Sequence, residues 1–518
     1  MNPRLLAQLI DEFRLSMRRL LFDLCRELQA DYQKLASQWN LPVGLFEQIG
    51  RSFDLASYST WRVVGWIESL NDLVYFLDLL QQWKKESNRT EFTRQLFREC
   101  QDKFFENSYL DDLFPSGAPT IGGFEQRLSS LCGRLAGEVT QEALFFEPAR
   151  AAQWLGRRSL SGWSVSGSLE ANFERPDPPG SIPVGVDGEW REAPAAVRRA
   201  LRRSSGQAIF HVEAERITLR IGRAAFPIWY KAGGREQWVW KRRIPFVIAR
   251  TEHGSVTVGP TLLYGQDRQP RDVRWTDPFQ VRRIRRAWRT VQAAWPEGFA
   301  VLECLTSRLV PLKAKGVVSF SYRHRPGLSF INCFDRDALD LIDDLIHENS
   351  HHHLNLLLRK YVMYRGDHNQ QIFYSPWRRS LRPLRGILHA TFTFTIGAML
   401  FERLSSWASG REGGKRWQRA GLTQRDLQRA RFRCFEEVES VRYSLQDLRY
   451  ADRYLGWLTG SGRRLVHQME EMIAEVESRM APYRQGVLHS TFGPLLHRHI
   501  ARLKQARRIY GPIRLTRV

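Results

Sequence analysis

The sequence predicts a mainly helical α+β protein, and three observations lead to that prediction. Apolar residues recur at helical spacing through much of residues 1–160 and again from about residue 276 onward. Between these regions, residues 161–275 contain stretches in which apolar and polar residues alternate, as they do in half-buried strands. A hydrophobic content of 43%, with 17 Trp, 15 Tyr and 29 Phe, indicates a folded chain with a large core. We expect a helical region at 1–160, a β-rich region at 161–275, a mostly helical domain at 276–483 and a basic tail at 484–518.

The first two regions show local order but no arrangement of catalytic residues. Leucines at helical spacing in residues 5–28 and 70–80 predict helices, which we interpret as a scaffold or a docking surface for a partner. In the β-rich region, Ala232-Gly233-Gly234 separates two alternating segments and predicts a hairpin. The prolines and glycines of residues 175–188 predict a loop.

Charge and cysteine content limit the environment of the protein. The formal net charge of +23 favours an acidic partner, although an arginine-rich composition alone would give the same value. No helix-turn-helix, zinc-finger or RNA-binding signature supports nucleic acid as that partner. The six cysteines are scattered without a CxxC pair, which favours a reducing, cytoplasmic location. We expect neither a signal peptide nor a membrane span.

The C-terminal domain contains the stretch on which the functional interpretation depends. Two short strands at residues 316–321 and 328–332, joined by a turn with Pro326-Gly327, predict a β-hairpin. The hairpin leads into residues 337–359, where apolar spacing, an acidic start and a basic end all predict a helix. On this helix His347, Glu348 and His351 form an HExxH motif. Because residues four apart share a helix face, both imidazoles could bind one metal ion with Glu348 beside it.

A third protein ligand is needed to complete a catalytic metal site. His389 is the preferred candidate, since a Pro-rich turn before it could fold it back against the HExxH helix. Glu402, on the same following helix, is an alternative, and His368 is a weaker one in a loop. His352 and His353 are expected near the site or on the surface rather than as ligands.

Three arginines crowd the segment that leads to His389: Arg378, Arg382 and Arg385. A guanidinium group pairs with a carboxylate in a bidentate manner. These arginines could therefore anchor a dicarboxylate such as 2-oxoglutarate, or the carboxylate of a peptide. A generic basic loop in an arginine-rich chain is the alternative interpretation.

Two motifs together resemble a known family. HENSHHHLNLLL followed by YSPWRRSLRPLRGILHATFTF is similar to the HExxH-motif family of peptide-modification proteins, which occur beside ribosomally made, post-translationally modified peptides. The similarity covers roughly residues 276–410. The resemblance implies that His347, His351 and His389 hold the metal and that Arg378 and Arg382 lie at the site. It further implies Fe(II)- and 2-oxoglutarate-dependent β-hydroxylation of a peptide side chain.

The sequence thus leaves three functions in competition. The first is an Fe(II)/2-oxoglutarate-dependent β-hydroxylase (a dioxygenase) that acts on a ribosomal precursor peptide, which could be acidic. The second is a zinc metallopeptidase, for example one that removes a leader peptide, with Glu348 as general base on a zinc-bound water. The third is a binding protein without enzymatic activity. The sequence does not predict the oligomeric state.

Overall fold

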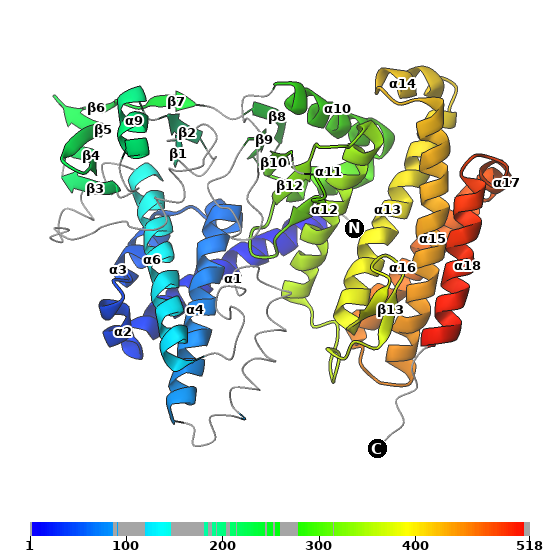
Figure 1. Cartoon of the computed structure of the whole chain (residues 1–518), viewed down its shortest axis with the longest axis horizontal. Helices are drawn as coiled ribbons and strands as arrows, with labels where there is room; N and C mark the ends of the chain where they lie inside the picture. Colours follow the sequence, from blue (N-terminus) through cyan, green and yellow to red (C-terminus); the bar gives the residue numbers. More distant parts are fainter. Residues whose placement is uncertain are drawn as a thin grey trace.

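The computed structural model describes residues 3–85, 91, 120–146, 181–184, 189–192, 194–203, 208–213, 215–243, 246–251, 254–259, 278–313 and 315–511. Within these ranges the protein is mainly helical with smaller β-sheets, as the sequence predicts (Figure 1). Most of the loop expected at residues 175–188 lies outside the described residues.

The N-terminal part is helical, as expected. Its helices are α1 (Pro3–Ala30), α2 (Gln33–Gln38), α3 (Val43–Ser52), α4 (Trp61–Lys85) and α6 (Ile121–Phe146), with a short 3-10 turn at Ala56–Ser59. Helix α4 buries apolar residues around most of its circumference, because α1 and α6 both pack against it. Helix α1 also contacts the HExxH helix, so the N-terminal part adjoins the C-terminal domain.

The middle part contains two antiparallel sheets. One is a four-stranded meander of β3 (Ala208–Glu213), β4 (Arg216–Ile221), β5 (Ala224–Ala232) and β6 (Arg235–Trp238). The other pairs β1 (Ser181–Val184), β2 (Glu189–Glu192) and β7 (Lys241–Arg243), and helix α9 spans Ala195–Arg203. Gly233 and Gly234 connect β5 to β6 with φ of 58° and 77°, a backbone region that favours glycine. The predicted hairpin is confirmed.

A five-stranded mixed sheet forms the base of the candidate site. Its strands are β8 (Phe246–Thr251), β9 (Gly254–Val258), β10 (Arg308–Leu312), β11 (Phe320–Ser321) and β12 (Leu328–Asn332), in the order β11-β12-β10-β9-β8. Strands β9, β10 and β12 are parallel, whereas β11 is antiparallel to β12 and forms one edge. The sheet therefore joins strands from both sides of the expected boundary at residue 275.

The remaining elements are mostly helices. They are α10 (Pro278–Ala294), α11 (Pro296–Leu305), α12 (Ala338–Lys360), α13 (Leu384–Ser409), α14 (Gly413–Arg419), α15 (Gln424–Arg453), α16 (Gly460–Met480), α17 (Arg484–Leu488) and α18 (Gly493–Tyr510), with a 3-10 turn at Ala481–Tyr483 and a small hairpin of β13 (Phe373–Ser375) and β14 (Ser380–Arg382). Helices α13, α15 and α18 stand side by side in Figure 1. The expected basic tail thus includes α18, which packs on α15.

Side-chain caps fix the starts of two of these helices. The capping box of Thr423 and Asp426 begins α15, which ends at Arg453. Gly460 begins α16, because the Thr459 side chain accepts a hydrogen bond from the backbone N–H of Gly462 and caps the helix.

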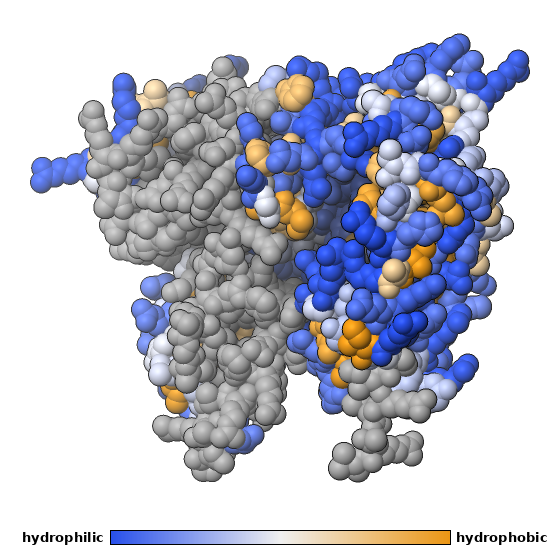
Figure 2. Space-filling view, turned by 45° about the vertical axis from the view of Figure 1, so that its right-hand side comes forward, coloured by the Kyte–Doolittle hydropathy of each residue, from blue (hydrophilic) through white to orange (hydrophobic). Residues whose placement is uncertain are grey.

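Among the described helices, α13 is long and apolar enough to cross a membrane by length and composition alone. The window concerned is 61% buried within the protein, and core helices commonly have the same composition. The face in Figure 2 is largely hydrophilic where it is coloured, with hydrophobic residues in small separate groups.

Candidate metal centre

The HExxH motif lies in the middle of α12. A capping box fixes the start of this helix: the Asp337 side chain accepts from the backbone N–H of Asp340, and the Asp340 side chain accepts from that of Asp337. Two turns further on, one nitrogen from each of His347 and His351 and one carboxylate oxygen of Glu348 all lie within 4.8 Å of one another. The two histidines are half-buried and Glu348 is buried, so the imidazoles lie at the more accessible side of the cluster.

A third imidazole reaches this cluster from α13. His389 Nε2 lies 2.6 Å from His351 Nδ1, and the centroids of the two rings are 4.8 Å apart. Helix α13 begins directly after Pro383 and packs along α12, which brings its second turn opposite the motif. The fold therefore places the His351 ring between the other two expected ligands: the centroids of His347 and His351 are 4.8 Å apart, and His389 contacts His351. The group of donor atoms within 4.8 Å of one another contains His347, Glu348 and His351, without His389.

The two alternative third ligands are engaged elsewhere. Glu402 is buried, its Oε1 accepts from Ser406 Oγ at 2.9 Å and its Oε2 lies 3.4 Å from Arg479 NH1 of α16. His368 Nδ1 lies 2.8 Å from the carbonyl oxygen of Gly366 in the loop after α12. These contacts leave His389 as the histidine beside the motif.

The chemistry of the donor set fits a divalent metal ion. Burial is the main cause that lowers the pKa of His347 and of His389 to about 4, and it also lowers the pKa of His351. The rings are therefore neutral at neutral pH, which is the form that binds metal.

Glu348 is tied to the edge strand of the sheet. Its Oε2 accepts a hydrogen bond of 2.8 Å from Ser321 Oγ in β11. Burial raises the pKa of Glu348 to about 8; the Ser321 hydrogen bond opposes that shift, and the nearby Asp344 and Asp343 add to it. Without a metal ion nearby, the carboxyl group holds a proton at neutral pH.

The two histidines after the motif are both buried, so neither is a surface residue. The backbone N–H of Gly327 points to His352 Nδ1 at 3.4 Å, so the proton lies on His352 Nε2, which donates to Ser329 Oγ at 3.0 Å. His352 thereby fastens α12 to the beginning of β12. His353 packs edge-on against Phe392 at 5.3 Å, and its Nε2 has no hydrogen-bond partner within the described part of the chain.

His353→Leu is expected to make the metal-free protein progressively more stable than wild type as the pH falls from about 6.5 to 4. Burial lowers the pKa of His353 to about 4, so the unfolded chain takes up a proton in this range that the native state refuses. Within that window, each fall of one pH unit lowers the free energy of unfolding of the wild type by about 1.4 kcal/mol. Leucine does not titrate, so the variant lacks this loss. Urea unfolding at pH 7, 6 and 5 measures the difference. The same change at the exposed His467 is the control, and a constant difference across the series would contradict the prediction.

An aromatic stack forms one wall beside His347. The Phe394 ring of α13 meets the His347 ring edge-on at 5.2 Å, and Trp377 stacks on Phe394 at 4.3 Å. Trp377 Nε1 donates to Glu437 Oε2 of α15 at 2.9 Å, and Arg433 NH2 lies 2.8 Å from Glu437 Oε1. Sequence reasoning noted the SPWR segment but not this role of its tryptophan. Nothing in the sequence indicated that Glu437, far along the chain, would hold it.

Cationic side chains border the imidazoles. Arg378 is exposed in the turn between β13 and β14, and its positive charge helps to lower the pKa of both His347 and His351. Of the other expected arginines, Arg382 lies in β14 and Arg385 in the first turn of α13, both half-buried. The sequence did not indicate Arg433, whose positive charge also lowers the pKa of His347.

No protein-family model matches this chain, and no curated protein matches it in sequence.

Proposed function

We propose that this protein is a metal-dependent enzyme that modifies a peptide. The observation that carries the proposal is the cluster of His347, His351 and the buried Glu348 on α12, with the His389 imidazole of α13 in contact with His351. Three protein ligands leave coordination positions open for substrate or co-substrate. A purely structural site would close those positions with protein donors.

The preferred reaction is Fe(II)- and 2-oxoglutarate-dependent β-hydroxylation of a side chain in a ribosomal precursor peptide. Bound iron would supply the oxidising chemistry. O₂ would be the co-reactant: one of its atoms would enter the C–H bond, and the other would enter succinate as 2-oxoglutarate loses CO₂. Arg378, exposed and close enough to influence the imidazoles, would pair with the distal carboxylate of 2-oxoglutarate. The resemblance of residues 347–358 and 374–394 to peptide-modification proteins supports this choice.

The edge of the sheet supports a peptide as the substrate. Strand β11 pairs only with β12 among the described strands, and its Ser321 touches the candidate centre. An extended peptide could add to this edge by backbone hydrogen bonds and so pass the metal. The net charge of +23 favours an acidic peptide. We place the enzyme in the cytoplasm, where a ribosomal precursor is made and where its described cysteines would remain free.

One observation favours a second function, zinc-dependent cleavage of a peptide. A Glu348 oxygen lies within 4.8 Å of the His347 and His351 nitrogens, where a general base for a metal-bound water would be placed. Zinc would polarise the scissile carbonyl group and the water. Glu348 would accept the proton of that water and pass it to the leaving amine.

Metal analysis and product analysis separate the two functions. Protein purified without oxygen is expected to carry iron and, with a precursor peptide, to convert 2-oxoglutarate into succinate while the peptide gains the mass of one oxygen atom. A zinc-loaded protein that splits the peptide into two fragments would establish the peptidase instead. A chain that binds neither metal would overturn both.

A further inference from the structure

Two carboxyl groups of α12 face two serine hydroxyls of the edge strand. Asp344 and Glu348 are four residues apart and so lie on one face of the helix. Ser319, immediately before β11, and Ser321, within it, are two residues apart and so lie on one face of the strand. Ser319 Oγ donates to Asp344 Oδ2 at 2.7 Å, and Ser321 Oγ donates to Glu348 Oε2 at 2.8 Å. Two residues along the strand thus correspond to one turn of the helix, and this places both serines within hydrogen-bond distance of the carboxyl groups.

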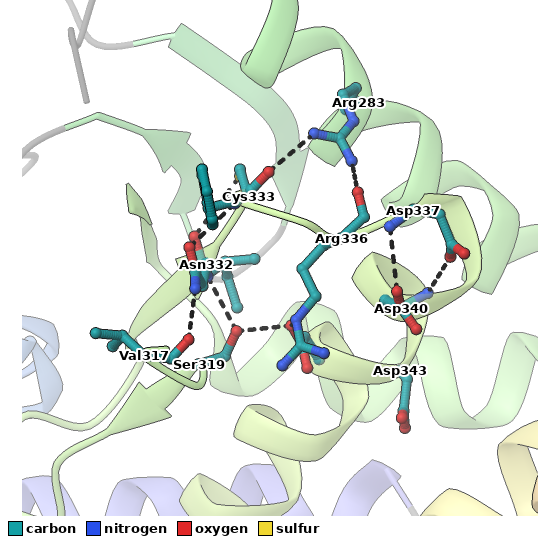
Figure 3. A network of polar contacts seen from close by, with 12 residues as sticks. Arg283, Val317, Ser319, Asn332, Cys333, Arg336, Asp337, Asp340 and Asp343 are labelled. Atoms are coloured by element: carbon teal, nitrogen blue, oxygen red, sulfur yellow. Dashed lines mark hydrogen bonds and ion pairs between the residues drawn. The ribbon is translucent and has the colours of Figure 1, made fainter. Parts of the chain in front are cut away.

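The Ser319 bond belongs to a larger network of hydrogen bonds and ion pairs that holds α12 to the sheet at Asp344, one turn before Glu348. Figure 3 shows Ser319 beside Asn332, whose backbone N–H donates to Ser319 Oγ at 3.0 Å. Asp344 Oδ2 also lies 3.4 Å from Arg336 Nε, and Arg283 donates to the carbonyl oxygen of Cys333 at 3.2 Å in the same network. Strand β11 is therefore attached to α12 through Ser319 whether or not Ser321 has a hydroxyl group.

We propose that Ser321 is a positioning residue for Glu348, with no essential part in holding the strand. Its hydroxyl group donates a hydrogen bond to Oε2 of the buried Glu348 carboxyl group. This hydrogen bond fixes the rotation of the carboxyl plane relative to the imidazoles. The proposal rests on the second of the two proposed functions, zinc-dependent cleavage, because that function gives Glu348 a task at the metal centre.

The same residue links Glu348 to the edge that would receive the peptide. The Ser321 side chain points to α12, while its backbone pairs with Ser329 of β12 at the rim of the sheet. A peptide added to β11 would keep its backbone contacts when only the hydroxyl group is removed. Loss of the hydroxyl group should therefore change kcat far more than KM.

Three variants test the role: Ser321→Ala, Ser321→Thr and, as matched control, Ser319→Ala. Removal of a group that orients a metal-site residue typically costs 10–100-fold, so Ser321→Ala is expected to lower kcat by about that factor with KM nearly unchanged. Ser321→Thr restores the hydroxyl group and should recover most of kcat. Ser319→Ala should lower the unfolding midpoint but keep kcat in the folded fraction. Equal losses in both alanine variants, or no recovery with threonine, would overturn the positioning role.

A readout without metal separates this inference from the proposed function. In urea unfolding of the metal-free chain, Ser321→Ala and Glu348→Ala should be non-additive, because they remove the donor and the acceptor of one hydrogen bond. Co(II) titration should show that Ser321→Ala still binds the ion, since all three imidazoles remain. A wild type that binds no Co(II) overturns the proposed function, whereas additive unfolding effects overturn the inference about Ser321.

Discussion

The His389→Ala variant is expected to lose its bound metal and to lose turnover by more than 100-fold. A change in a residue that merely supports a metal ligand costs 10–100-fold in affinity or activity, so removal of a ligand should cost more. His389 stands 2.6 Å from His351, and without it the cluster retains only two imidazoles from one helix. Metal content per chain, measured after gel filtration, checks the expectation together with turnover.

Two controls make this test specific. His368→Ala removes a histidine that contacts the Gly366 carbonyl oxygen instead of the cluster, and Glu402→Gln removes the charge of the alternative ligand. Both variants should keep their metal. If His389→Ala keeps a full complement of metal while Glu402→Gln loses it, the assignment of the third ligand is wrong.

The Gly65→Val variant should destabilise the protein by about 3 kcal/mol or more, through a contact far from the metal centre in sequence. A Cβ atom at residue 65 would lie 1.5 Å from Arg325 NH1 and 2.0 Å from its Cζ. The Arg325 guanidinium is buried there and donates to the Arg62 carbonyl oxygen at 3.3 Å. Any side chain at residue 65 must therefore drive a buried charged group out of its place.

Activity should fall together with stability in this variant. Arg325 lies in the turn between β11 and β12, four residues after Ser321, so its displacement disturbs the strand that contacts Glu348. Urea unfolding and turnover of the folded fraction measure the two effects. Gly397→Ala, in the interior of α13, is the control, because apart from its chain neighbours and the backbone of its own helix no atom lies within 4 Å of its added Cβ. Equal stability of the two variants would contradict the packing argument.

The N-terminal helices contact the helix that carries the motif. At the C-terminal end of α12, Arg359 forms an ion pair with Glu68 of α4, and Lys360 forms one with Glu12 of α1. The exposed ion pair between Lys360 and Glu12 contributes little to the stability of the fold. The hydrogen bond from Arg325 to the α4 backbone contributes more to stability, because it is buried.

Local sequence patterns were sufficient for the helix that carries the motif. Asp337 and Asp340 indicated its start, and the spacing of His347 and His351 placed both imidazoles on one face, as the structure has them. The hairpin at Gly233-Gly234 was equally visible, because its turn requires residues that tolerate positive φ. In both cases the determining contacts lie within a few residues of each other.

Such local patterns could not predict contacts between segments that lie far apart in the sequence. The pairing of β9 with β10 joins strands on opposite sides of the expected boundary at residue 275, and neither strand carries a signal for its partner. The burial of His352 and His353 was also missed, since helical spacing shows which face a residue occupies but not what covers that face.

The sequence by itself determined a mainly helical α+β chain, a capped helix with an HExxH motif and a short set of candidate third ligands. Only the tertiary structure placed His389 against His351, brought Ser321 to Glu348 and placed Trp377 beside Phe394. The physical reason is that hydrogen bonding and side-chain spacing within a helix or turn act over a few residues. The choice between distant partners depends on how whole helices and strands pack.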